Sequence, residues 1–416
     1  MKELELKGQK AKKASYFLAN LSSEEKDNAL KNISKRLVER SEEIIKANSL
    51  DLYNAMEKGT SKTMLDRLSL DEDRIKAIAQ GVLDIVSLKD PVGEVTSMFK
   101  RPNGLKIGVQ KVPLGVIGII YEARPNVTVD AAALCLKSGN AVILRGGKEA
   151  INSNLKIVEI MNEALKECNF EEGAINILED TSRETAKEFM KLNKYLDVLI
   201  PRGGAGLIRS VVENATVPVI ETGTGNCHIY IDEECDMEMG KDIIVNAKTS
   251  RPSVCNAAES LLVHENIAEK FLPLAIKALK EKGVEIRACE KTREILKDSD
   301  IKEATEEDYG TEFLDYILSV KVVKDIDEAI DHINKYGTKH SEAIVTTNYF
   351  NSEKFLQRVD AAAVYVNAST RFTDGGEFGF GAEIGISTQK LHARGPMGLK
   401  ELTTNKYIIY GNGQIR

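Results

Sequence analysis

The sequence predicts an α/β protein with more than one domain, built around a doubly wound parallel sheet. Between residues 114 and 221, segments with strand and helix patterns alternate five times through short connections, as in a parallel sheet covered by helices. Residues 229–360 begin a second α/β pattern. At 416 residues the chain is also too long for one compact core. We therefore expect a Rossmann-like domain and a second α/β domain.

Composition narrows the class of protein. The formal net charge is −7, and the 64 acidic and 57 basic residues are interspersed, so no basic block indicates nucleic acid. The N-terminus lacks the apolar core of a signal peptide, and the longest apolar run, 116–120, is too short for a membrane span. The cysteines form no C-x-x-C pair and no disulfide-like spacing, which favours a reduced, cytoplasmic protein. The five histidines lack metal-ligand spacing, so we expect no metal site.

Residues 1–90 have helical patterns. Ser22 with Glu25 fits a capping box before one helix, and Ser69 with Glu72 fits another. We recognise no chemistry in these helices. We assign 1–96 and 113–228 to a cofactor-binding domain, which part of 362–399 could rejoin.

Two short segments predict a β arm. Residues 97–112 have a hairpin pattern with Asn103-Gly104 as turn residues, and 400–416 contain a strand that ends in a Gly-Asn-Gly turn. Each is too small to be stable alone. Together they predict an oligomerisation arm that pairs across a subunit interface, and hence a homo-oligomer, a dimer or larger.

The alternating pattern defines the elements of the parallel sheet. We expect strands at 115–123, 140–145, 174–178, 197–201 and 217–221, with helices between them. The second α/β domain is expected over 229–361, with helices at 239–250, 265–283 and 325–337 and a strand at 259–264. The glycine-rich segment 367–386 is too long for a simple turn, and long loops of this kind are often functional.

Cys255 is the candidate nucleophile, and Glu221 lies 34 positions before it (255 − 221 = 34). A partly ionised thiol attacks carbonyl carbon readily. Cys255 follows a predicted helix and an Arg-Pro turn, so a loop is expected to present it. The usual alternative is a buried structural cysteine, which suits Cys135 and Cys168 well.

Five long blocks of sequence carry a resemblance to a known family. The chain resembles the gamma-glutamyl phosphate reductases, the glutamate-5-semialdehyde dehydrogenases of proline biosynthesis, within the aldehyde dehydrogenase superfamily. The blocks GTGNCH (223–228) and EIGISTQKLHARGPMGL (383–399) separate this family from ordinary aldehyde dehydrogenases. The blocks are found at 112–150, 198–208, 219–232, 250–264 and 378–399.

The resemblance implies a reaction and an aldehyde dehydrogenase-like fold. NADPH would reduce L-glutamyl 5-phosphate to L-glutamate 5-semialdehyde and phosphate, through a thioester on Cys255. Each tetrahedral oxyanion needs hydrogen-bond donors, and the family implies the Cys255 backbone N–H and the Asn126 side-chain amide. The alternative for Asn126 is a helix N-cap. Glu221 aligns with a superfamily glutamate that activates water for thioester hydrolysis. Water is the wrong nucleophile in the implied reaction. Glu221 would therefore either help to deprotonate Cys255 or order the loop.

Three arginines are candidates for substrate binding. The implied substrate carries an α-carboxylate and an acyl phosphate, and guanidinium groups suit both anions. Arg124 and Arg251 precede prolines beside the proposed oxyanion donor and the nucleophile, and Arg371 lies in the glycine-rich segment. Their alternative is surface arginines in turns.

The cofactor residues are implied mainly by the resemblance, since the chain has no G-x-G-x-x-G. Arg145 and Lys148 lie near the position of a lysine that holds the adenosine ribose, and two cations would favour the 2′-phosphate of NADP. Gly203 and Gly204 open a helix and would let the cofactor approach its N-terminus, although a plain tight turn is the usual explanation. Glu312 aligns with a glutamate that holds the nicotinamide ribose, and its alternative is a solvated acid.

Two rival functions stay open at this point. One is a different thiol-dependent acyl reductase, such as a CoA-acylating aldehyde dehydrogenase or another acyl-phosphate reductase. The other is a nucleotide-binding regulatory protein without catalysis, against which the intact segment around Cys255 argues. Contact with glutamate 5-kinase, which would make the unstable substrate, is chemically reasonable, although no residue indicates it.

Overall fold

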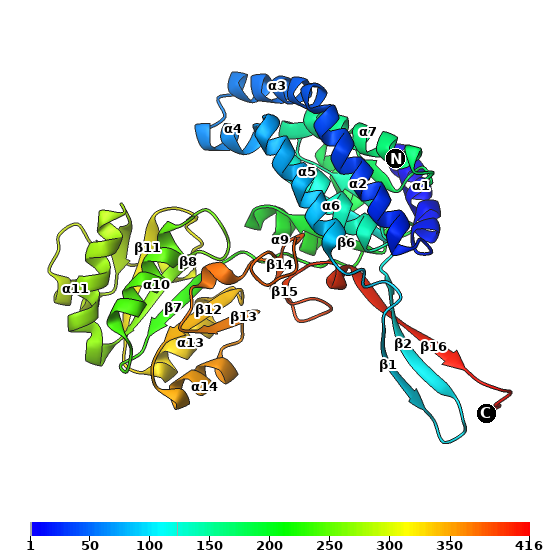
Figure 1. Cartoon of the computed structure of the whole chain (residues 1–416). Coiled ribbons are helices and arrows are strands. Elements are labelled where there is room, and N and C mark those ends of the chain that lie inside the picture. Colours follow the sequence, from blue (N-terminus) through cyan, green and yellow to red (C-terminus); the bar gives the residue numbers. More distant parts are fainter. Residues whose placement is uncertain (1, 123) are drawn as a thin grey trace. The chain divides into compact units, whose positions relative to one another are not determined.

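A computed structural model describes residues 2–122 and 124–416, and divides them into two compact units (Figure 1). The first unit runs to Thr222 and regains the chain at Gly379–Gly385 and Met397–Arg416. The second unit comprises Gly223–Phe378 and Ile386–Pro396. The sequence pattern predicts the boundary between the two domains after residue 228. In the structure, the boundary between the two units lies after Thr222.

Helices make up the N-terminal part of the first unit, as predicted. The helices are α1 (Lys2–Leu18), α2 (Ser23–Glu39), α3 (Ser41–Glu57), α4 (Lys62–Leu68) and α5 (Glu72–Ser87). The capping box of Ser22 and Glu25 at the start of α2 is confirmed. The capping box predicted for Ser69 is wrong, because Ser69 is the C-cap of α4 and Asp71 caps α5 by accepting a hydrogen bond from the Arg74 N–H at 2.8 Å.

The predicted parallel sheet of the first unit is confirmed with four strands in the order β5-β4-β3-β6. In chain order this is 3-2-1-4, which is four of the six strands of the Rossmann order 3-2-1-4-5-6. Its strands are β3 (Val116–Tyr121), β4 (Ala141–Arg145), β5 (Ile175–Ile177) and β6 (Val198–Arg202). The last residue of the strand predicted over 115–123, Ala123, lies outside the described residues.

The fifth predicted strand, 217–221, is wrong as a full strand. The structure has a single parallel bridge there, between Leu199 and Val219. The Leu199 N–H donates to the Pro218 carbonyl and the Ile220 N–H donates to the Leu199 carbonyl, but Pro218 has no N–H with which to extend the ladder. The segment therefore ends the sheet rather than widening it.

Helices cover this sheet in layers (Figure 1). The crossover helices are α6 (Pro125–Lys137), α7 (Ile151–Glu167), α8 (Arg183–Phe189) and α9 (Ala205–Asn214). Helix α1 packs on β3, β4 and β5, whereas α2, α3 and α5 form an outer layer over α6 and α7. No helix within residues 2–122 and 124–416 is both long enough and apolar enough to cross a membrane.

A three-stranded antiparallel sheet belongs to the first unit and extends from its helices (Figure 1). Strands β1 (Val95–Lys100) and β2 (Lys106–Pro113) form the predicted hairpin, and β16 (Thr403–Tyr410) pairs along the whole of β2. The pairing of these distant segments is confirmed. We call this sheet the arm.

The second unit is built on a seven-stranded parallel sheet in the order β10-β9-β11-β8-β7-β12-β13. Its strands are β7 (Cys227–Ile231), β8 (Ala258–His264), β9 (Glu285–Ala288), β10 (Lys302–Glu303), β11 (Ile317–Val323), β12 (Ser341–Val345) and β13 (Ala363–Val366). Its helices are α10 (Met237–Thr249), α11 (Glu265–Glu281), α12 (Glu290–Leu296), α13 (Ile326–Tyr336) and α14 (Tyr349–Arg358). Between β13 and β16 the chain is largely irregular, apart from the short pair β14 (Ile386–Ser387) and β15 (Gly395–Pro396).

Apolar residues fill both faces of this second sheet. Ile229 and Ile231 of β7 point to one face and pack with Phe271 of α11, whereas Tyr230 points to the other and packs with Phe355 of α14. This alternation is the period of two expected of a strand. Because both faces are covered, the strands are rich in apolar residues, and the polar Glu259 of β8 and Glu342 of β12 lie near the strand starts.

Candidate active site

Cys255 lies in a turn between the end of α10 and the start of β8, at the amino edge of the second sheet. This position in a turn confirms the predicted loop presentation. Cys255 is half-buried there. The next residue anchors the turn, because the Asn256 amide donates to the carbonyls of Arg371 at 3.2 Å and Thr373 at 2.9 Å. Thr370 in turn donates to the Asn256 carbonyl at 2.7 Å. The turn is therefore tied to the glycine-rich segment.

Gly225 and Cys227 hold the other side of Cys255. A Cβ atom on Gly225 would lie 1.4 Å from the Cys255 carbonyl oxygen, so only glycine permits this approach. The Cys227 thiol donates to the same oxygen at 3.2 Å. Burial raises the pKa of Cys227 well above its ordinary value, so this thiol stays protonated and acts as a donor rather than a nucleophile.

Glu312 belongs to this same framework. Its Oε1 accepts a hydrogen bond from the Gly225 N–H at 2.6 Å, and burial raises the pKa of its carboxyl group. The alternative of a solvated acid is wrong, because Glu312 is partly buried and engaged with backbone. Its predicted contact with the nicotinamide ribose stays a prediction.

Two of the predicted substrate arginines lie close to Cys255. Arg251 is exposed, and Arg371 is half-buried with its Nε donating to Ser250 Oγ at 3.1 Å. Burial and the neighbouring Arg251 guanidinium lower the pKa of Arg371, whereas Asp374 and Cys255 act in the opposite direction. The structure thus brings Arg251, Arg371 and Cys255 into one electrostatic neighbourhood.

Glu221, Arg124 and Asn126 belong to the first unit. Glu221 is half-buried beside Thr222, whose hydroxyl donates to the Pro201 carbonyl at 2.8 Å. Because Cys255 belongs to the second unit, the joint action of these residues with the thiol stays a prediction.

The N-cap alternative for Asn126 is wrong. Helix α6 starts at Pro125 and Arg124 is its N-cap residue, so Asn126 lies inside the first turn. Its amide donates to Asp130 at 3.1 Å. Burial raises the pKa of Asp130 to about 6.

The predicted cofactor glycines lie at the carboxyl edge of the first sheet. Gly203 and Gly204 follow β6 directly, and Gly204 is the N-cap residue of α9. Both are exposed, and the Gly204 N–H donates to Glu122, which follows β3, at 2.9 Å. Strands β3 and β6 are neighbours whose chain order reverses, which is where doubly wound sheets bind nucleotides.

Arg145 is the last residue of β4, and Lys148 follows that strand at the same edge. Arg145 is partly buried and donates to the carbonyls of Thr181 at 2.6 Å and Ser182 at 3.3 Å, and burial lowers its pKa. Lys148 is exposed in a short 3₁₀ turn. Of the two cations, Lys148 is thus the more accessible to a bound anion.

Sequence reasoning missed Gly225, Cys227 and the buried pair of Lys248 and Glu259. The segment GTGNCH signals the family, but nothing in its spacing indicates that Gly225 contacts a residue 30 positions later (255 − 225 = 30). Such contacts arise from the pairing of β7 with β8, which places the two preceding loops side by side.

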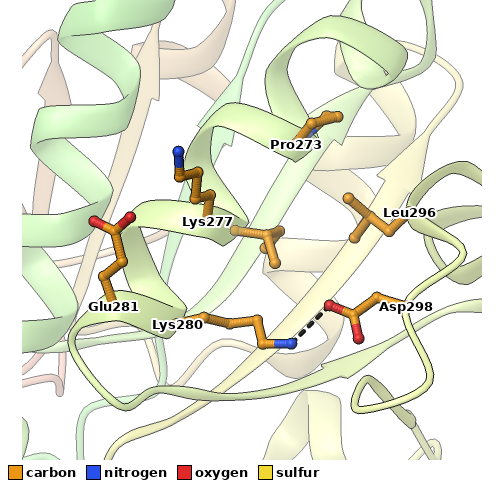
Figure 2. A pocket seen from close by; sticks show the side chains of 7 residues that line it. Pro273, Lys277, Lys280, Glu281, Leu296 and Asp298 are labelled. Atoms are coloured by element: carbon orange, nitrogen blue, oxygen red, sulfur yellow. Dashed lines mark hydrogen bonds and ion pairs between the residues drawn. The ribbon is translucent and has the colours of Figure 1, made fainter.

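A groove of about 520 Å³ on the second unit contains none of the predicted site residues (Figure 2). It lies along α11 beside the segment that follows α12, and its walls include Pro273 and Leu296. Its polar side chains largely neutralise one another, since Lys280 pairs with Asp298 at 2.6 Å. We assign it no chemistry.

A Rossmann-type sheet and a second α/β unit that presents a thiol in a turn define the aldehyde dehydrogenase-like class of α/β proteins. The model of the Aldehyde dehydrogenase family matches residues 2–292 and 304–408. A gamma-glutamyl phosphate reductase of Clostridium perfringens is 78% identical over 414 residues, which cover 100% of this chain and 99% of that protein. The chain therefore belongs to the aldehyde dehydrogenase family and, within it, to the gamma-glutamyl phosphate reductases, and it is an oxidoreductase.

Solved structures agree with this assignment. The crystal structure of gamma-glutamyl phosphate reductase from Thermotoga maritima matches with a TM-score of 0.98 and 53% identity over 100% of both chains. An acetylating aldehyde dehydrogenase from Geobacillus thermoglucosidasius matches with a TM-score of 0.71 and 19% identity, over 100% of this chain and 98% of that one. This second match supports the fold alone. Members of the family use a nicotinamide cofactor.

Proposed function

We propose that this chain catalyses the NADPH-dependent reduction of L-glutamyl 5-phosphate to L-glutamate 5-semialdehyde and phosphate, a step of proline biosynthesis. The observation that carries the proposal is the half-buried Cys255 turn, clamped by Gly225 and Asn256 and flanked by two arginines. Thiolates are favoured beside such cations. The name of the Clostridium perfringens relative supplies the substrate.

In the first step the Cys255 thiolate attacks the acyl carbon, and the carbon–oxygen bond to phosphate breaks. Inorganic phosphate leaves with the bonding electron pair, and Cys255 carries a thioester. Arg251 and Arg371 are proposed to hold the phosphate and the α-carboxylate, with Arg124 as a third cation from the first unit. Glu221 is proposed either to take the thiol proton or to order its loop.

In the second step the thioester is reduced and the aldehyde leaves. NADPH, when bound, supplies the hydride. The Cys255 N–H and the Asn126 amide are proposed to donate hydrogen bonds to the oxyanion that forms at each tetrahedral stage. Collapse of the thiohemiacetal returns the Cys255 thiol and releases the semialdehyde.

The carboxyl edge of the first sheet suits a dinucleotide. Exposed glycines at the N-terminus of α9 allow an anion to approach backbone N–H groups, and a Cβ on Gly203 would meet the Glu122 carboxylate at 2.7 Å. Lys148 is proposed to hold the 2′-phosphate of NADP, with Arg145 shaping the loop beside it. Glu312 is proposed to hold the nicotinamide ribose.

The proposal also covers the setting of the reaction. A cytoplasmic setting is proposed because the six cysteines form no C-x-x-C pair and have no disulfide-like spacing. The arm is proposed to join subunits of a homo-oligomer. Direct delivery of the acyl phosphate by glutamate 5-kinase is proposed because the substrate is unstable.

The experiment that tests the proposal is reduction of NADP⁺ by the purified protein with L-glutamate 5-semialdehyde, with and without inorganic phosphate. We expect phosphate-dependent activity that Cys255→Ala abolishes. Cys235→Ala is the matched control, because burial raises the pKa of that thiol to about 11 and it should not react. Activity without phosphate would overturn the proposal in favour of a hydrolytic dehydrogenase, and activity that needs CoA would favour the CoA-acylating alternative.

A further inference from the structure

A buried ion pair closes the base of the turn that carries Cys255. Lys248 lies in the last turn of α10, and Glu259 is the second residue of β8. Their side chains are both 0% exposed, and Lys248 Nζ lies 2.5 Å from Glu259 Oε2. Because the chain between them forms the nucleophile turn, this pair joins the two ends of that turn. We call it the clasp.

The clasp also reaches the opposite side of Cys255. Glu259 Oε1 accepts a hydrogen bond from the Leu314 N–H at 3.1 Å. Leu314 has a φ of 55°, a left-handed conformation that is unusual for leucine and needs support from its surroundings. Two residues before it, Glu312 holds the N–H of Gly225, which packs against the Cys255 carbonyl. The contacts therefore form a closed circuit around the nucleophile.

Stability alone is a poor reason for such a pair. Burial lowers the pKa of Lys248 and raises the pKa of Glu259 to about 7, which reflects the cost of removing both charges from water. Apolar side chains of similar volume often stabilise a protein as well as a buried ion pair does. What the ion pair adds to apolar packing is a directional contact between one atom of α10 and one atom of β8.

We propose that Lys248 and Glu259 are positioning residues for Cys255, whose ion pair sets the place of the nucleophile turn and of the Gly225 loop. The proposal rests on the proposed function, since that function assigns the chemistry to Cys255. The substrate anions are assigned to arginines rather than to the clasp. Loss of the clasp should therefore lower kcat and leave KM nearly unchanged, because small misplacements of a reacting group cost up to about 100-fold in rate.

The first test is the double variant Lys248→Met with Glu259→Gln. It removes both charges together and keeps an amide oxygen to accept from the Leu314 N–H. The matched control is Lys26→Met with Asp90→Asn, which removes another buried ion pair, in the first unit, and keeps an acceptor for the Val92 N–H. We expect kcat to fall on the order of ten- to a hundred-fold in the clasp variant, with KM within about twofold and the control close to wild type.

A second readout needs no substrate. The rate at which iodoacetamide labels Cys255 is measured by peptide mass spectrometry, with the half-buried Cys289 of the same unit as the internal reference. We expect labelling of Cys255 to be at least about fivefold slower in the clasp variant, with an unchanged rate at Cys289. If the wild-type protein shows no phosphate-dependent activity, the proposed function fails, but the labelling rate still decides whether the clasp positions the thiol.

Two outcomes would overturn the proposal. One is a folded clasp variant with wild-type kcat and wild-type labelling of Cys255, which would make the pair purely structural. If that variant does not fold, Glu259→Asp replaces it, since aspartate keeps the charge but withdraws the carboxylate by one methylene. Wild-type kcat and labelling in Glu259→Asp would then be the second contradicting outcome.

Discussion

Gly225 is the position near the nucleophile where a side chain would do most harm. A Cβ there would lie 1.4 Å from the Cys255 carbonyl oxygen and 2.6 Å from its Cα, so one of the two loops must move. We predict that Gly225→Ala lowers kcat on the order of 100-fold or more, since the nucleophile turn is displaced. Steady-state kinetics and Cys255 labelling measure the effect.

Gly81→Ala is the control for this prediction. Gly81 lies in α5, where an added Cβ atom would meet nothing within 4 Å, so alanine should raise stability by about 0.5–1 kcal/mol through better helix propensity. Its kcat should match that of the wild type. A Gly225→Ala enzyme with normal kcat would show that the approach of the two loops is not required.

His332 makes the stability of the second unit depend on pH. Its ring packs between Tyr309 and Tyr336, and burial, followed by the charge of His228, lowers its pKa to about 2. The folded state therefore keeps His332 neutral, whereas the unfolded chain binds a proton below about pH 6.5. The contribution of neutral His332 to the unfolding free energy is therefore present above that pH. It falls by about 2 kcal/mol between pH 7 and pH 5.

His332→Phe should remove this dependence. Lowering the pH from 7 to 5 costs the wild type about 2 kcal/mol of unfolding free energy through His332. We predict that the variant does not suffer this loss. Urea unfolding at the two pH values measures it. The comparison must be with the wild type, because the raised pKa of Glu259, about 7, acts in the opposite direction over this range. Equal slopes in the two proteins would contradict the prediction.

At the residue scale, the sequence identifies the residue that reacts better than the residues that hold it. Cys255 is recognisable because its neighbours match a family, and its position in a turn follows from the helix and Arg-Pro pair before it. Gly225, Cys227, Lys248 and Glu259 are not recognisable, because their roles depend on which strands become neighbours in the sheet. Arg145 looks like a cofactor ligand in the sequence, yet it is already engaged with backbone carbonyls.

At the scale of elements, the N-cap residue of α5 differs from the one that the sequence pattern predicts. Both Ser69 and Asp71 are good N-cap residues, but the Arg74 N–H donates to Asp71. We predict that Asp71→Ala lowers the unfolding free energy by about 1 kcal/mol, whereas Ser69→Ala changes it by less than about half of that. Thermal or urea unfolding of both variants measures the difference. Equal losses, or a larger loss for Ser69→Ala, would contradict the assigned cap.

The elements themselves follow from the sequence wherever the apolar pattern is long. The parallel strands β3, β4 and β6 and the helices between them lie where hydrophobic periodicity predicts them. The failure at 217–221 has a local cause, because Pro218 interrupts the donors that a further strand requires. The pairing of β16 with β2 joins segments about three hundred residues apart, and the sequence indicated it only because each short strand pattern is too small to be stable alone.

At the scale of the whole molecule, the chain divides the proposed chemistry between two units. The glycines for the cofactor belong to the first unit, and Cys255 with two arginines belongs to the second. The chain passes from one to the other between Thr222 and Gly223, just after Glu221.

The arm presents an apolar face that one chain does not cover within the described residues. Phe99, Ile107 and Ile409 are paired across its three strands, and Phe99 and Ile409 are 47% and 59% exposed. Tyr407 lies on the same face and is 66% exposed. A three-stranded sheet with an exposed apolar face and two open edges is marginally stable by itself, so a second copy of the chain is the natural cover.

Ile409→Lys tests whether the arm joins subunits. A charge on the apolar face would lose its hydration in an interface, so we predict that the variant has a lower oligomer mass than the wild type at equal concentration. Light scattering after size-exclusion chromatography measures the mass. Lys406→Glu is the matched control, because Lys406 lies on the opposite face of the same strand and is already charged and exposed. If Ile409→Lys leaves the mass unchanged, or if the wild type is itself a monomer, the arm does not join subunits. If instead the mass falls while Cys255 labelling stays normal, assembly and nucleophile positioning are separate properties of the fold.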